Sequence, residues 1–197
     1  RTVMANAARY KDIELNSERY KAGLKQFEQN MRFLLQRYQR AGVQVYLSTV
    51  ASNLATLAPF NSLPLTAEQE ATLTQLEQQL GSLPAADVQK LMLPKLAELT
   101  ATHSLSAHWH YRLGQLYLKL QQSDSARVHL TRARDLDLLR FRAPSAINDI
   151  IRTLARDYGA ILVDNEAALA KHSAQSVIGD EMMLEHVHPT IAGYFVL

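Results

Sequence analysis

The stretch AGVQVYLSTVASN, residues 41–53, decides the fold. Before it, apolar residues recur at three- and four-residue spacing over 17–40, which predicts one buried face of a long helix. Gly42 ends that helix, and 43–50 is a nearly continuous apolar run rich in β-branched and aromatic residues. A helix, a glycine and a buried strand in this order predict an α/β unit with a parallel sheet.

The same order of patterns recurs near the other end of the chain. Pro144 begins a second segment of helical periodicity, Gly159 stops it, and 160–164 is a short apolar run typical of a buried strand. Repetition of helix, glycine and strand is typical of βαβ architecture. We therefore expect two α/β parts, at 1–60 and at 141–197.

Residues 61–140, between these parts, contain only helical patterns. Within them, 106–138 resembles a single tetratricopeptide repeat. Gly114 and Ala126 are small at the positions where two antiparallel helices would approach closely, and Leu130 would fill the gap between them. One repeat is fewer than the roughly three that a solenoid needs. We expect 61–140 to be a helical insertion that packs on another part of the chain.

Composition and charge exclude several classes of function. The chain has 197 residues, of which 47% are apolar and 20% charged, as in an ordinary globular domain. A net charge of +2 does not favour binding to nucleic acid. The absence of cysteine excludes disulfides, thiol catalysis and thiolate metal sites within this chain. No apolar run reaches the roughly 18 residues of a transmembrane helix.

Candidate chemistry is concentrated in the stretch GDEMMLEHVHPTIAGY, residues 179–194. Glu185 precedes His188 by three residues, and Pro189 disfavours the helical conformation for His188. Pro189 is also expected to be the first residue of a new helix, which places His188 on an exposed turn. A carboxylate beside an imidazole supplies two parts of a general-base relay. The third part, a nucleophile, is not evident in this stretch.

Two alternatives to a catalytic pair remain. Glu185 and His188 are also compatible with a charged surface loop. Together with His186 they have the right chemistry for a metal site, but alternate residues in one short loop rarely converge on an ion, and no fourth ligand is evident. The sequence therefore predicts neither a metal nor another cofactor.

Polar residues at the ends of the predicted strands are the next candidates, because the carboxyl ends of parallel strands line the ligand crevice of an open sheet. After the first strand these residues are Ser48, Thr49, Ser52 and Asn53. Strand-end capping and turn formation are the simpler explanation for each of these residues. Arg142 and Asn148 are further candidates, either for contact with a substrate or as a hinge of the insertion, with a salt bridge and a helix-surface amide as the simpler alternatives.

Three blocks together resemble the SGNH (GDSL-like) hydrolases, namely 42–54, 142–151 and 185–194. The resemblance implies a partial flavodoxin-like three-layer parallel sheet with an all-α, tetratricopeptide-like insertion. It also implies that His188 is the catalytic histidine and Glu185 its acid, although the usual acid of the family is Asp.

The serine of the family lies in a Gly-Asp-Ser motif, which this chain lacks. We therefore expect the chain to be the C-terminal part of such a hydrolase, with the serine upstream of Arg1.

The function implied by the resemblance is a serine-dependent ester hydrolase that acts on an ester or an acetylated glycan. With a sugar hydroxyl as acceptor in place of water, the same relay gives an O-acyltransferase. The alternative from a different class is a scaffold that binds a protein partner through 64–138, with a non-catalytic hydrolase-like part. Proteins that resemble this one are often bacterial, extracytoplasmic or membrane-anchored, which is an expectation from the resemblance alone.

Overall fold

A computed structural model describes residues 12–82, 85–100 and 104–197. Within these ranges the chain forms eight α-helices, one short 3-10 helix and two strands. In chain order the elements are α2 (Glu18–Arg40), β1 (Tyr46–Ser48), α3 (Ala67–Ser82), α4 (Ala85–Thr100), α5 (Ala107–Lys119), α6 (Ser123–Leu136), α7 (Ser145–Tyr158), β2 (Ile161–Val163), α8 (Asn165–His172), η1 (Ala174–Ser176) and α9 (Ile191–Val196).

The predicted flavodoxin-like three-layer sheet is wrong, because the described residues form only a two-stranded sheet in a mainly helical chain. Strands β1 and β2 pair in parallel, with Leu47 opposite Leu162. The apolar run at 43–50 contributes only three residues to the ladder. Past β1, the backbone amide of Val50 bonds to the side chain of Asn148, which takes the place of a neighbouring strand. The local pattern thus identified the parallel pair but not the size of the sheet.

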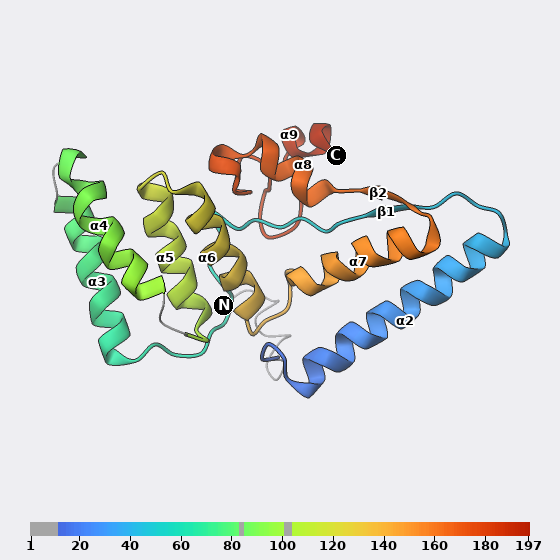
Figure 1. Cartoon of the computed structure of the whole chain (residues 1–197), viewed down its shortest axis with the longest axis horizontal. Helices are drawn as coiled ribbons and strands as arrows, with labels where there is room; N and C mark the ends of the chain where they lie inside the picture. Colours follow the sequence, from blue (N-terminus) through green and yellow to red (C-terminus); the bar gives the residue numbers. More distant parts are fainter. Residues whose placement is uncertain (1–11, 83–84, 101–103) are drawn as a thin grey trace.

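Helices α2 and α7 lie side by side beneath this sheet (Figure 1). Leu47 of β1 packs into a cluster with Leu35 of α2 and Leu154 of α7, all of them buried. The glycines that end α2 and α7 have positive φ angles, so the chain reverses direction there without the steric cost that other residues would incur. The sheet therefore directs its carboxyl ends toward the helical segment and the C-terminal loops.

Helices α3 to α6 form the separate group on the left of Figure 1, with a core centred on Trp109 and its neighbours. Close packing at Gly114 is confirmed: a Cβ atom added there would lie 2.5 Å from the Leu130 Cγ. Helix α4 continues through Pro94, which lies in its interior. None of the described helices combines the length and the hydropathy needed to cross a membrane.

Substitution of Gly114 tests the close contact between α5 and α6. We expect Gly114→Ala to reduce the free energy of unfolding by about 1–3 kcal/mol, because overpacking a buried contact outweighs the better helix propensity of alanine. Gly23, in α2, is the matched control, since an added Cβ has no atom within 4 Å there. Gly23→Ala should stabilise the protein by up to about 1 kcal/mol. Urea unfolding measures both; equal effects of the two substitutions would contradict the packing.

Candidate functional site

The candidate block at 179–194 folds as a closed loop ahead of α9. Met183 and Pro189 form an isolated antiparallel bridge, and the Leu184 amide donates to the His188 carbonyl at 2.8 Å. Helix α9 begins at Ile191, two residues later than predicted, because Thr190 caps it by accepting a hydrogen bond from the Gly193 amide. Residues 184–188 therefore lie at the tip of a short hairpin-like loop.

Glu185 is the centre of this loop and accepts hydrogen bonds on both carboxylate oxygens. Oε1 accepts from the backbone amide of His188 at 2.9 Å and pairs with the Nδ1 of the same imidazole. Oε2 accepts from the backbone amide of His186 at 2.8 Å and pairs with the Nδ1 of that ring. The His188 side chain remains 71% exposed. Its Nδ1 is thus held by an acid while its Nε2 has no partner among the described residues, as a general base requires.

His186 is the less exposed of the two imidazoles, with 15% of its side chain exposed. Its ring packs edge-on against Phe60, with the centroids 5.5 Å apart, and lies beside Phe141. Burial lowers the pKa of His186, and the neighbouring His188 and Arg142 lower it further. The packing of His186 against Phe60 and its pairing with Glu185 anchor the loop. Within the part of the chain that the structure describes, no group of three His, Cys, Asp or Glu side chains is placed to hold a metal ion.

The loop rests on the chain segment that follows β1. The backbone amide of Asn53 donates to the His186 carbonyl at 3.0 Å. The Asn53 side chain closes a turn by accepting from the Thr56 amide, and Ser52 is only 2% exposed, with no partner for its Oγ. The structure thus brings Ser52 and Asn53 next to the loop that carries His188. Both side chains are buried in this state, so they do not face a substrate.

Arg142 and Asn148 also contact backbone groups of this segment. The Arg142 Nη1 donates to the carbonyls of Asn53 and Leu57 at 2.9 and 3.1 Å. Asn148 donates to the Val50 carbonyl and accepts from the Val50 amide, as a paired strand would. Burial lowers the pKa of Arg142, and a nearby Asp137 partly opposes this effect. Both side chains are buried, and both hold backbone in place.

Ser48 and Thr49, at the end of β1, connect the sheet to α8. The Thr49 Oγ1 donates to Asp164 at 2.9 Å and accepts from the Glu166 amide, while Ser48 accepts from the side chain of Asn165. These contacts cap the first turn of α8. Ser48 and Thr49 therefore act as caps at the end of a strand, which was the simpler of the two expectations for them.

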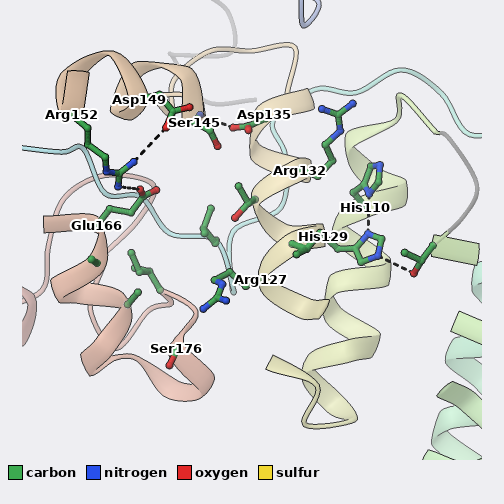
Figure 2. A pocket seen from close by; sticks show the side chains of 17 residues that line it. His110, Arg127, His129, Arg132, Asp135, Ser145, Asp149, Arg152, Glu166 and Ser176 are labelled. Carbon is green, nitrogen blue, oxygen red and sulfur yellow. Dashed lines mark hydrogen bonds and ion pairs between the residues drawn. The ribbon is translucent and has the colours of Figure 1, made fainter. Parts of the chain in front are cut away.

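A pocket of about 740 Å³ lies between α6 and the helices α7 and α8 (Figure 2). At one end, the Nδ1 atoms of His110 and His129 are 2.9 Å apart, and the His129 Nε2 contacts the Thr100 Oγ1 at 3.1 Å. His129 is almost fully buried. Burial, together with the charge on His110, lowers the pKa of His129 to about 4.

Sequence reasoning missed this pair, although His129 follows Ala126 by three residues and precedes Ala133 by four. That spacing places His129 on the buried face of α6, and it was the signal available in the sequence.

The other end of this pocket contains charged groups that pair with one another. Arg134 contacts Asp135 and Glu166 at 3.1 Å each, and Arg152 contacts Glu166 at 3.0 Å. Figure 2 shows Arg152 and Glu166 facing each other across α7 and α8. Arg152 also pairs with Asp149 at 3.6 Å, so each charge named here has a partner of opposite sign.

Comparisons of the chain with models of protein families, with curated proteins and with solved structures find no match. A functional interpretation therefore depends on the geometry of the loop at 183–190 and of its neighbours.

The buried His129 predicts a specific dependence of stability on pH. Its folded pKa of about 4 lies below the ordinary value of about 6.5, so the unfolded chain binds a proton that the folded chain excludes. Stability should therefore fall as the pH decreases from about 6.5 toward 4, and at pH 5 His129 alone should cost about 2 kcal/mol. His110, whose pKa burial also lowers, adds to the loss.

The variant His129→Gln removes the His129 part of this effect and is compared with His172→Gln, which changes an exposed histidine of α8. Urea unfolding at pH 7 and pH 5 should show a smaller loss of stability in His129→Gln than in the wild type or in His172→Gln. Equal losses in all three proteins would contradict the assignment of the low pKa to His129.

Proposed function

We propose that this chain supplies the histidine and the acid of a serine-dependent ester hydrolase of the SGNH type. The observation that supports the proposal is the pairing of the His188 Nδ1 with Glu185, which leaves the Nε2 at the exposed tip of the loop. In this proposal the serine lies outside these 197 residues. Ser52 is not the nucleophile in this proposal, because its Oγ is buried and has no hydrogen-bond partner.

The chemistry of the pair follows from its geometry. With the proton of the neutral ring on Nδ1, the Nε2 of His188 takes the proton of the serine hydroxyl while its oxygen attacks the ester carbonyl. The imidazolium that forms is stabilised by Glu185. It then gives its proton to the departing alkoxide, and an acyl-enzyme remains. Water, activated by the same base, cleaves the acyl-enzyme and releases the acid.

The exposure of His188 supports a bulky substrate over a small one. A base at the tip of a surface loop is accessible to an ester carried on a polymer, such as an acetylated glycan, without closure of a cavity. The acceptor in the second step distinguishes two activities, since water gives hydrolysis and a sugar hydroxyl gives acyl transfer. Both activities require the same histidine and the same acid.

A role in binding a protein partner is the second candidate, and the pocket beside α6 favours it. On this interpretation 64–138 recruits a partner and the loop at 183–190 is only structural. The two candidates are distinguished on the full-length protein. Ester hydrolysis that His188→Ala abolishes supports the enzyme, whereas no hydrolysis, together with capture of a partner that is lost on deleting 64–138, supports the scaffold.

Kinetic assays on the full-length protein test the catalytic pair. We expect hydrolysis of an acetyl ester and labelling by a fluorophosphonate. We expect His188→Ala to reduce kcat by roughly 10³-fold or more, because no general base remains. Glu185→Gln should reduce kcat by roughly 10²- to 10⁴-fold, since the amide does not select the same tautomer. His172→Ala is the control, because this histidine is exposed on α8, and it should retain the wild-type rate.

Three outcomes would contradict the proposal. The first is that a full-length protein with a Gly-Asp-Ser motif hydrolyses no acetyl ester. The second is that the fluorophosphonate does not label it. The third is that His188→Ala and His172→Ala hydrolyse the ester at equal rates.

A further inference from the structure

The junction between the helical segment and the α/β part is a cluster of buried polar contacts. The chain leaves the α/β part at 53–61 and returns to it at 137–142, and the two segments meet where the Leu138 amide donates to the Asn61 carbonyl at 3.0 Å. Asp137 accepts three backbone amides here, those of Phe60, Asn61 and Leu139, at 2.9 to 3.1 Å.

Arg142 occupies the centre of this junction. Its Nη2 donates to Asp137 at 3.1 Å, and both side chains are 2% exposed. Its Nη1 donates to the carbonyls of Asn53 and Leu57. The Nε of Arg142 is also buried and has no hydrogen-bond partner. A buried charge with an unsatisfied N–H is unfavourable for stability, so its presence calls for another explanation.

Two chains of contacts lead from Arg142 to His186, which shares a carboxylate with the candidate base, His188. In the first, Arg142 holds the carbonyl of Asn53, and the amide of the same residue holds the carbonyl of His186. In the second, the guanidinium lies over the Phe60 ring, 6.0 Å from its centroid, and Phe60 packs edge-on against His186. His186 and His188 share the carboxylate of Glu185. Displacement of Arg142 therefore acts on His186 by both routes and, through Glu185, on His188.

We propose that Arg142, fixed by Asp137, is a positioning residue that holds the loop at 183–190 in the state where Glu185 selects the Nδ1–H tautomer of His188. It touches neither the substrate nor the reacting atoms. Its consequence for catalysis depends on the proposed ester hydrolase, but its effect on the imidazole does not depend on any reaction.

Nitrogen NMR of the histidine side chains tests the tautomer directly. Above neutral pH we expect the wild-type His188 to carry its proton on Nδ1, because Glu185 accepts it. In Arg142→Gln the loop loosens, and His188 should shift toward the Nε2–H tautomer. Exchange of the Asn53 amide should become about tenfold faster, which corresponds to the loss of about one hydrogen bond. Arg142→Lys should give a smaller change, since an ammonium can pair with Asp137 but lacks the fork that reaches both carbonyls.

Arg134→Gln is the matched control. Arg134 is equally buried and pairs with Asp135 and Glu166, and among the described residues it has no hydrogen bond or ion pair with the loop at 183–190. It should reduce stability and leave the His188 tautomer and the Asn53 exchange rate as in the wild type. If Arg142→Gln does not fold, Arg142→Lys provides the measurement. An unchanged His188 tautomer in a folded Arg142 variant would overturn the positioning role, as would the same change in Arg134→Gln.

Activity separates this proposal from the proposed function. If the full-length protein hydrolyses esters, Arg142→Gln should reduce kcat with little change in KM, because the base is misaligned while substrate contacts remain. If the protein hydrolyses none and the tautomer still responds to Arg142, the enzyme proposal fails and the positioning role stands.

Discussion

The buried ion pair between Asp137 and Arg142 is the interaction on which the arrangement of the chain depends. Taking two charges out of water costs several kcal/mol per ion unless hydrogen bonds satisfy the remaining donors and acceptors. Here the backbone supplies most of them: three amides donate to Asp137, and two carbonyls accept from Arg142. The pair is thus stable only when the segments at 53–61 and 137–142 lie together. It specifies where the helical segment leaves the α/β part and where it returns.

Local patterns predicted those parts of the fold that depend on local geometry. The helix, glycine and strand order found both strands of the parallel pair, because backbone periodicity and a positive φ are properties of a few adjacent residues. The approach of α5 and α6 followed from the small side chain at Gly114 for the same reason. The number of strands in the sheet did not follow. It depends on which distant segments pair with the strands already present. At Val50 the side chain of Asn148 takes the place of a neighbouring strand.

The candidate site shows the same difference between features that local sequence determines and features that distant contacts determine. Glu185 and His188 were identified from three residues of separation, and the structure joins them within one loop. Ser52 and Asn53 were selected for their position after the strand, and Arg142 as a candidate contact with a substrate. Neither position nor residue type reveals whether a side chain faces solvent. All three are buried, so they support the loop and do not line a cleft.

Because the carboxylate of Glu185 pairs with two imidazoles, the protonation state of His186 affects how strongly the carboxylate interacts with His188. A protonated His186 would attract the carboxylate strongly and would draw it away from the developing imidazolium. Packing against Phe60 and proximity to Arg142 oppose that protonation, which is the direction in which the pKa of His186 is shifted. A neutral His186 still donates one hydrogen bond and so fixes the carboxylate in place. The charge of Glu185 then remains available to His188, the more exposed of the two imidazoles, whose side chain is 71% exposed against 15% for His186.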